Sequence, residues 1–293
     1  MADINAKTKL LCLLGNPVEH SLSPVIHESL SKIKEHNFAY MAFRVEEEAL
    51  GDAVKGLTAL GAKGANVTVP HKRAVMEYLK EIDEKASLIG AVNTLVPVPG
   101  GLKGYNTDMP GLWRAMEYDG ITLKGKNAVV IGAGGASNAV LCMLLEAGAK
   151  NILLLNRSKE KALSLAEHFM TAYPERKITV ASYEEKYLER MDEIGGNEKW
   201  LAIQATSVGM HPNVTVSAIE NPAFYKKIEI GYDLIFNPAK TKFMELVEAQ
   251  GGKAFNGLKM LLFQGIMAYE LWTGDTITDE DAALVLQKLE ETR

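Results

Sequence analysis

Lys72 and Asp108 are the charged side chains in this sequence that best suit proton transfer to or from an alcohol. Lys72 closely follows the run Asn66-Val-Thr-Val-Pro, and Asp108 ends the run Tyr105-Asn-Thr. Oxidation of an alcohol by hydride transfer needs a group that takes the hydroxyl proton, and an ammonium beside a carboxylate orients both groups. We therefore predict that Lys72 and Asp108 form a catalytic pair. The structural alternatives are a solvated lysine and a helix-capping aspartate.

Polar side chains in three short segments of the first domain would surround such a pair. Asn66 and Thr68 alternate with valines, so both point to one face of a strand. Asn93, and Ser21 with Ser23, occupy further strand ends and turns, where open α/β sheets bind ligands. Each motif alone is also ordinary turn or cap chemistry. Together their hydroxyl and amide groups suit a small polyhydroxy substrate.

A glycine-rich turn begins at Gly132, between an apolar strand and a helical segment. This context is the one that a dinucleotide-binding turn requires. Gly132 permits the tight turn, Gly134 lets the backbone approach a pyrophosphate, and the helix N-terminus offers free N–H groups. The third small residue is Ser137 in place of glycine, so the fingerprint is imperfect, and a turn without a ligand is the alternative.

The next strand indicates which dinucleotide would bind. NAD-binding folds often carry Asp or Glu at the end of this strand, where it bonds the ribose hydroxyl. Here the strand ends in Asn156, Arg157 and Ser158, and Lys161 follows. A guanidinium matches the geometry of a 2′-phosphate. We therefore expect NADP in preference to NAD, with a solvated helix start capped by Ser158 as the structural alternative.

The elements that would position these residues form two successive alternations of strands and helices, typical of the α/β class. In the first, the pattern predicts strands at 10–14, 38–45, 64–69 and 92–96, and helices at 23–36 and 46–60, with Ser23 as N-cap. In the second it predicts strands at 127–131, 151–155, 177–181, 200–204 and 228–234, and helices at 135–147 and 159–169. Helices at 258–272 and 279–290 close the chain, and the polar stretch 190–199 is expected to be a surface loop.

Composition narrows the class of protein. The chain has 293 residues, 47% of them hydrophobic, and a formal net charge of -5, which favours two globular domains and argues against a nucleic-acid partner. Cys12 and Cys142 lie in apolar runs without metal-ligand spacing, so we expect buried thiols and no metal. Because no apolar signal core and no run of about 18 apolar residues occurs, we expect a cytoplasmic protein without a membrane span.

Taken together, these motifs resemble those of the shikimate dehydrogenase family, in order and over essentially the whole length. The matching stretches are GNPVEHSLSPVIH from Gly15, NVTVPHK from Asn66, IGAVNT from Ile89, GYNTD from Gly104, IGAGGAS from Ile131, NRS from Asn156, ATSVGM from Ala205, DLIFNPAKTKF from Asp233 and NGLKMLLFQG from Asn256.

The resemblance implies an α/β fold in which residues 1–110 and 258–293 form a substrate-binding catalytic domain with a mostly parallel sheet, and residues 111–257 a Rossmann-like NADP-binding domain. It assigns the catalytic pair to Lys72 and Asp108. It assigns substrate binding to Ser21, Ser23, Asn66, Thr68, Asn93 and Gln264. It assigns the cofactor to Gly132, Gly134, Gly135, Ala136, Asn156, Arg157, Ser158, Thr206, Val208 and Met210.

The activity implied is the reversible reduction of 3-dehydroshikimate to shikimate with NADPH, a step of chorismate and aromatic amino acid biosynthesis, by a monomer or homodimer. Several positions depart from the family pattern: Met109 stands where glycine is usual, Phe236 where tyrosine is usual, and Gln204 where asparagine is usual. Asn138 and the segment from Asn256 also differ. These departures favour, as an alternative, a quinate/shikimate paralogue acting on quinate or a related cyclic polyhydroxy acid, with NAD as the alternative cofactor.

Overall fold

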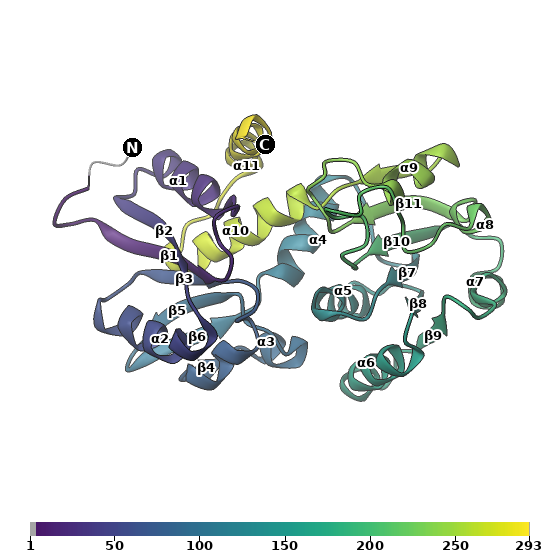
Figure 1. Cartoon of the computed structure of the whole chain (residues 1–293), viewed down its shortest axis with the longest axis horizontal. Helices are drawn as coiled ribbons and strands as arrows, with labels where there is room; N and C mark the ends of the chain where they lie inside the picture. Colours follow the sequence, from purple (N-terminus) through teal and green to yellow (C-terminus); the bar gives the residue numbers. More distant parts are fainter. Residues whose placement is uncertain (1–3, 293) are drawn as a thin grey trace. The chain divides into compact units, whose positions relative to one another are not determined.

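The computed structural model describes residues 4–292, and the chain divides into two compact units. Unit 1 comprises residues 1–112 and 261–293, and unit 2 comprises residues 113–260. The divisions fall inside two helices, α4 (Asp108–Tyr118) and α10 (Leu258–Thr273). Figure 1 shows that each unit is built around its own sheet.

Unit 1 contains a six-stranded sheet in the order β2-β1-β3-β5-β6-β4. Its strands are β1 (Lys9–Gly15), β2 (Phe38–Arg44), β3 (Gly64–Val67), β4 (Glu81–Ile82), β5 (Thr94–Val98) and β6 (Gly101–Tyr105). Its helices are α1 (Ser23–Ile33), α2 (Leu50–Ala59), α3 (Glu84–Ile89) and α11 (Asp279–Thr292), with 3-10 turns η1 (Glu47–Ala49) and η2 (Ala74–Tyr78).

Alternate residues of β1 bury the two faces of this sheet. Cys12 packs with Val54 and Leu57 of α2, whereas Leu11 packs with Ala268 and Trp272 of α10. The sheet is therefore covered on both sides, which explains why β1 reads as a continuous apolar run. Helix α10, from the C-terminal part of the chain, therefore covers one face of the sheet that the N-terminal part forms.

Unit 2 contains a six-stranded sheet in the order β12-β11-β10-β7-β8-β9, and every pair is parallel. Its strands are β7 (Asn127–Ile131), β8 (Asn151–Asn156), β9 (Ile178–Ser182), β10 (Trp200–Gln204), β11 (Ile228–Asp233) and β12 (Lys253–Phe255). Its helices are α5 (Gly135–Glu146), α6 (Lys159–Ala172), α7 (Tyr187–Gly195), α8 (Pro222–Tyr225) and α9 (Lys242–Ala249).

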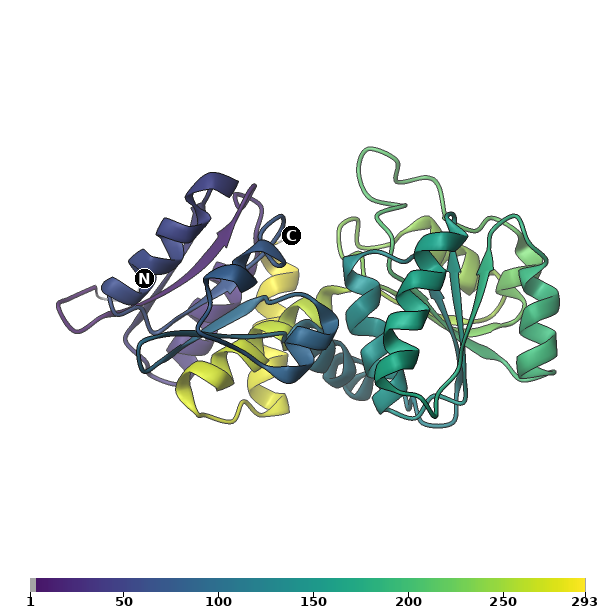
Figure 2. The same ribbon diagram turned by 90° about the horizontal axis from the view of Figure 1, so that it is seen from below.

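This strand order is that of a doubly wound Rossmann-like sheet, and it reverses between β7 and β10. One face buries Val129 and Leu153 against side chains of α7, α8 and α9, including Met191 and Phe243. Figure 2 shows α5 and α6 lying along the other face. The α/β class expected from the sequence is thus observed in both units, and ligands of such a sheet bind at the carboxyl edge beside the reversal.

Three local expectations were wrong. Ser23 is the first residue of α1 and not its N-cap, because the side chain of Ser21 accepts the Ser23 N–H at 3.2 Å. The strand near residue 92 begins at Thr94 and runs antiparallel to β3, and it is also antiparallel to β6 because the turn at Gly100 joins β5 and β6 as a hairpin. The stretch 190–199 is mostly α7, and Met191 anchors it to the core.

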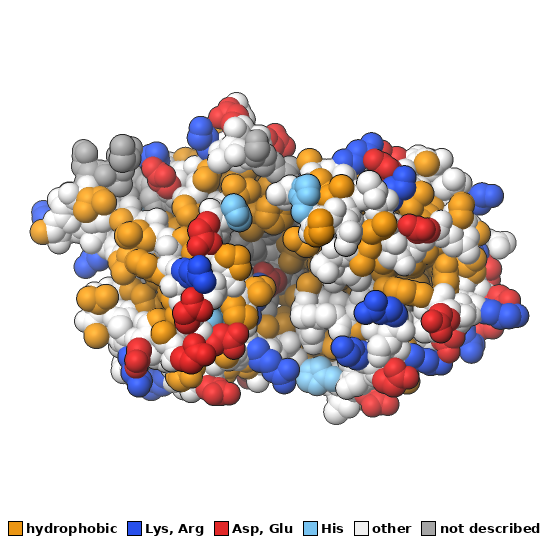
Figure 3. Space-filling view, viewed as in Figure 1, with side chains coloured by type: hydrophobic (Ala, Val, Ile, Leu, Met, Phe, Trp, Pro, Cys, Tyr) orange, Lys and Arg blue, Asp and Glu red, His pale blue; other side chains and the backbone are white. Residues whose placement is uncertain are grey.

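The surface carries charges of both signs. On the face drawn in Figure 3, Lys and Arg side chains are interspersed with Asp and Glu. None of the helices described within residues 4–292 combines the length and the apolar character needed to cross a bilayer.

Candidate active site

In unit 1, Lys72 and Asp108 form an ion pair in which Lys72 Nζ lies 2.6 Å from Asp108 Oδ2. The side chains are 30% and 18% exposed, so the pair is sheltered but still reachable. Lys72 follows β3, and Asp108 opens α4, where Asn106 Oδ1 accepts its backbone N–H at 3.0 Å. This cap fixes the start of α4, and the ammonium and carboxylate are held in one orientation.

Asn93 connects this pair to its surroundings. Its Nδ2 donates to Asp108 Oδ1 at 2.9 Å and reaches Gln264 Oε1 of α10 at 3.5 Å. Its Oδ1 accepts the backbone N–H of Thr107 at 2.8 Å and is buried with it. Both carboxylate oxygens of Asp108 are therefore bonded, one to Lys72 and one to Asn93. The other N–H donors of the Lys72 ammonium are not used by Asp108.

Asn66 lies beside this array on β3 and is buried. Its Nδ2 donates to the carbonyl oxygen of Asn93 and to Thr94 Oγ1, both at 3.3 Å, and its Oδ1 accepts the hydroxyl of Tyr40 at 2.8 Å. Burial raises the pKa of Tyr40, and a hydrogen bond from Ser23 partly offsets the rise. Tyr40 on β2 and Asn66 on β3 are separated by β1, and the tyrosine side chain reaches across that strand. Only the sheet order reveals this contact.

The remaining predicted residues of unit 1 occupy the loops that leave β1 and β3. Ser21 and Ser23 lie at the start of α1, with Ser23 buried. Thr68 follows β3 and packs so closely on Gly15 that a Cβ there would meet Thr68 Cγ2 at 2.3 Å. Thus Lys72, Asp108, Asn93, Gln264 and Asn66 form one hydrogen-bonded array, and the Tyr40 hydroxyl joins it through Asn66.

In unit 2, the glycine-rich turn leaves the carboxyl end of β7. Gly132 has φ +110°, and a Cβ there would meet Thr206 Cγ2 at 2.7 Å, so glycine is required on both grounds. Its N–H donates to the carbonyl oxygen of Leu155 at 2.7 Å, and Ser137 Oγ donates to its carbonyl oxygen at 2.8 Å. The serine that replaced the third glycine thus ties the turn to the first turn of α5.

The same turn leaves room for a ligand. Gly134 and Gly135 are exposed, and a Cβ at either would meet no atom within 4 Å. No side chain caps α5, whose N-terminal N–H groups begin at this point. A backbone cradle without side chains at a helix N-terminus fits the pyrophosphate of a dinucleotide.

The residues that end β8 lie next to this turn, because β7 and β8 pair in register at Ile131 and Leu155. Asn156 Nδ2 donates to the carbonyl oxygen of Ser158 at 2.8 Å, and Ser158 Oγ caps α6 by accepting the Lys161 N–H at 3.4 Å. Arg157 is exposed and makes no ion pair with a carboxylate among residues 4–292. Its guanidinium is available for an anion such as a ribose phosphate.

Across the strand reversal, the loop after β10 carries Thr206, Val208 and Met210. Ala205 N–H donates to the carbonyl oxygen of Ile131 at 2.9 Å, which sets this loop beside the glycine-rich turn. Thr206 and Val208 are half-buried, whereas Met210 is 46% exposed. All three regions predicted for the cofactor therefore meet at one edge of one sheet.

A doubly wound sheet with a glycine-rich turn at its reversal defines the class of Rossmann-like dinucleotide-binding folds. Family models match two stretches: residues 13–95 match the shikimate dehydrogenase substrate binding domain, and residues 115–194 match shikimate / quinate 5-dehydrogenase. The shikimate dehydrogenase (NADP(+)) of Caldanaerobacter subterraneus subsp. tengcongensis is 44% identical over 272 residues, covering 93% of this chain and 94% of that protein. This chain belongs to the shikimate dehydrogenase family.

Solved structures agree. A shikimate dehydrogenase in complex with NADP+ superposes with a TM-score of 0.85 at 38% identity, covering 97% of this chain and 96% of that one. Shikimate 5-dehydrogenase from Listeria monocytogenes, in complex with shikimate and NAD, gives a TM-score of 0.88 at 31% identity, covering 98% and 99%. The family expected from the motifs is confirmed.

Proposed function

We propose that this protein is an NADP-dependent oxidoreductase that interconverts shikimate and 3-dehydroshikimate. The observation that carries the proposal is the pair of Lys72 and Asp108, 2.6 Å apart and bonded through Asn93 to Gln264. Relatives named for this activity with NADP(+), at 40–44% identity, support it.

The pair serves as the proton donor and acceptor of the reaction. When the ketone is reduced, an ammonium hydrogen of Lys72 passes to the carbonyl oxygen as that oxygen gains negative charge. When the alcohol is oxidised, the pair receives the hydroxyl proton. Asp108 holds Lys72 Nζ in place, and Asn93 holds Asp108 in turn, so the donor is oriented before the substrate arrives.

The other polar residues of unit 1 hold the substrate. Ser21 and Ser23 bind its carboxylate, and Asn66, Thr68, Asn93 and Gln264 bind its hydroxyls or carboxylate. This assignment is supported by the array in which Asn66 bonds the carbonyl oxygen of Asn93 and the Asn93 side chain reaches Gln264. We assign residues 1–110 and 258–293 to this substrate-binding catalytic domain.

Residues 111–257 hold the cofactor. NADP, when bound, supplies the hydride acceptor of the oxidation. The open cradle at Gly134 and Gly135 fits its pyrophosphate, and the exposed Arg157 fits its 2′-phosphate. Gly132, Ala136, Asn156 and Ser158 complete this side, and Thr206, Val208 and Met210 line the nicotinamide half.

An assay of absorbance at 340 nm tests the proposal, with shikimate and quinate each offered with NADP and with NAD. We expect the highest kcat/KM for shikimate with NADP. Absence of turnover with every pair would refute the proposal.

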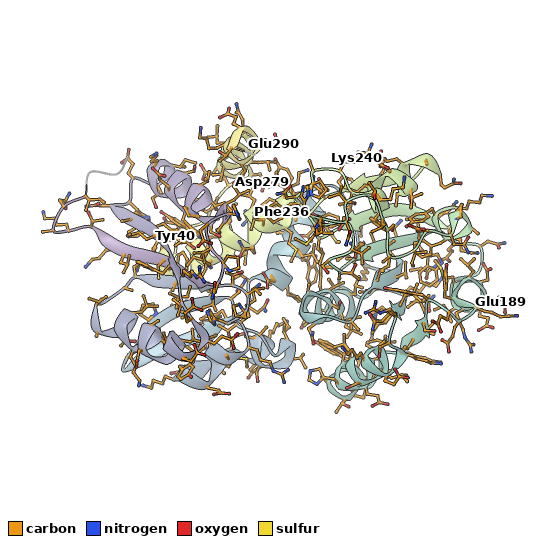
Figure 4. The ribbon with its side chains drawn as sticks, viewed as in Figure 1. Tyr40, Glu189, Phe236, Lys240, Asp279 and Glu290 are labelled. Atoms are coloured by element: carbon orange, nitrogen blue, oxygen red, sulfur yellow. The ribbon has the colours of Figure 1, made fainter. Side chains whose placement is uncertain are left out.

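A second candidate is a quinate/shikimate dehydrogenase, and a specific observation favours it. Phe236 follows β11, is labelled in Figure 4, and carries no hydroxyl where the family usually has tyrosine. The Listeria relative, crystallised with NAD, supports a relaxed cofactor choice. In the assay above, a kcat/KM for quinate above that for shikimate would establish this alternative.

We also propose a cytoplasmic location and a monomeric or homodimeric state. Cys12 and Cys142 are buried and neither forms a disulfide among the described residues, which supports a reducing compartment. Sedimentation equilibrium of the purified protein would decide the oligomeric state, and any larger assembly would contradict it.

A further inference from the structure

Gln204, the last residue of β10, is fully buried and uses both ends of its amide on the loop that follows it. Its Oε1 accepts the backbone N–H and the hydroxyl of Thr206, each at 2.6 Å. Its Nε2 donates to the carbonyl oxygens of Val208 at 3.0 Å and Thr206 at 3.3 Å. One side chain thus fixes the backbone of residues 206–208.

A buried carboxylate on the neighbouring strand sets the orientation of this amide. Asp233 ends β11, and its Oδ1 accepts from Gln204 Nε2 at 3.4 Å and from the N–H of Ile235 at 3.0 Å. Its Oδ2 accepts the hydroxyl of Thr241 at 2.6 Å. Because a carboxylate only accepts, it directs the amino end of Gln204 toward β11 and the carbonyl end toward Thr206.

The loop that Gln204 fixes lies where a dinucleotide would place its second nucleotide. In a doubly wound sheet each half of the sheet receives one nucleotide, and β7 and β8 carry the glycine-rich turn and Arg157. The half formed by β10 and β11 is left for the nicotinamide. Gly132 confirms the closeness of the two parts, because a Cβ there would meet Thr206.

We propose that Gln204, oriented by Asp233, is a positioning residue that holds the 206–208 loop ready for the nicotinamide half of the cofactor. The proposal rests on the proposed use of NADP. Phe236 and Lys240, labelled in Figure 4, belong to the segment between β11 and α9 that the Asp233–Thr241 hydrogen bond closes. The carboxylate therefore braces two loops at one edge of the sheet.

The test compares two ligands that share the adenosine half. Titration calorimetry would measure the Kd of NADP and of adenosine 2′,5′-bisphosphate, which lacks the nicotinamide half. In Gln204→Met, which keeps the length but loses the amide, we expect the Kd of NADP to rise about tenfold, the effect of one or two lost hydrogen bonds. The Kd of the bisphosphate should stay within twofold of the wild-type value. A variant that destabilised the whole of unit 2 would instead raise both Kd values.

A matched variant serves as the control. Asn127→Leu removes another buried amide from unit 2, at the start of β7, where it bonds Glu198 and Asn151. We expect it to lower stability while leaving the Kd of NADP unchanged.

Hydrogen exchange of the unliganded wild type gives a test that needs no variant. The amides of Thr206 and Val208 should exchange slowly, because Gln204 Oε1 and Thr206 Oγ1 accept them. Exchange at the rate of an unstructured peptide, or an NADP Kd within twofold of wild type in Gln204→Met, would overturn the proposal. If the wild type binds neither ligand, the proposed function is refuted. The hydrogen-exchange result alone then tests whether Gln204 fixes the 206–208 loop.

Discussion

The two units prepare for their ligands in opposite ways. In unit 1 the candidate groups are side chains that already bond one another, as Lys72, Asp108 and Asn93 do. In unit 2 the candidate cradle is bare backbone at Gly134 and Gly135, with an exposed Arg157 beside it. A preorganised side-chain array suits chemistry at one atom, whereas open backbone and a cation suit the binding of an extended anion.

The comparison predicts that changes in unit 1 alter kcat and changes in unit 2 alter cofactor affinity. The largest effect should come from Lys72→Ala, which removes the proposed proton donor. We expect kcat to fall by about 10²–10⁴-fold, the usual contribution of general acid–base catalysis, with little change in the Kd of NADP. Steady-state kinetics and calorimetry measure the two quantities, and thermal unfolding checks that the variant folds. Turnover near that of wild type would remove Lys72 from the mechanism.

The second effect in size is expected at Arg157. Arg157→Ala should raise the KM for NADP by about 10–100-fold, because a charge-assisted hydrogen bond to phosphate contributes roughly 1.5–3 kcal/mol. The KM for NAD, which has no 2′-phosphate, should hardly change. Lys161→Ala offers a matched control, since Lys161 is also exposed near the start of α6. Equal effects on both cofactors would mean that Arg157 does not contact the phosphate.

A smaller effect concerns stability and pH. Burial raises the pKa of Asp233 to about 6, so the folded state takes up a proton there that the unfolded chain, with its lower pKa, does not. Stability from this group is therefore complete at low pH and lost as the pH rises through about 6. Between pH 8 and pH 5 the wild type should gain about 1 kcal/mol relative to Asp233→Asn.

Denaturant unfolding of both proteins at each pH measures this difference, and the other titrating groups cancel because both proteins share them. A difference that does not change with pH would show that Asp233 stays ionised throughout this range.

The smallest effect should come from Ser158→Ala, which removes the cap of α6. A lost N-cap costs about 1 kcal/mol of unfolding free energy. If Ser158 also binds the cofactor, the KM for NADP rises as well, and the rise should be smaller than at Arg157. Chemical denaturation and kinetics on the same sample separate the two roles. An unchanged KM would leave Ser158 with the cap alone.

Local sequence determined most of the elements and the chemistry of the site residues. Apolar runs and glycine-rich turns place β7, α5 and β8 to within a residue or two, because their periodicity and caps are local. The motifs around Lys72, Asp108 and Gly132 indicate the family without any contact information. The sequence did not predict helix α7, because most of its residues are polar and only Tyr187 and Met191 have the spacing of a helix face. The structure shows that these two side chains pack in the core of unit 2.

Only the tertiary structure decided which of these residues meet. The Tyr40 hydroxyl reaches Asn66 across β1, which lies between their strands, and Asn93 reaches Gln264 across 171 positions of sequence. The hydrogen bond between Asp233 and Gln204, which orients the amide toward its loop, likewise depends on the pairing of β10 with β11. Sequence specifies each strand through local propensity and pattern, but strand order and register arise from packing over the whole unit, and it is this order that sets the distances between functional groups.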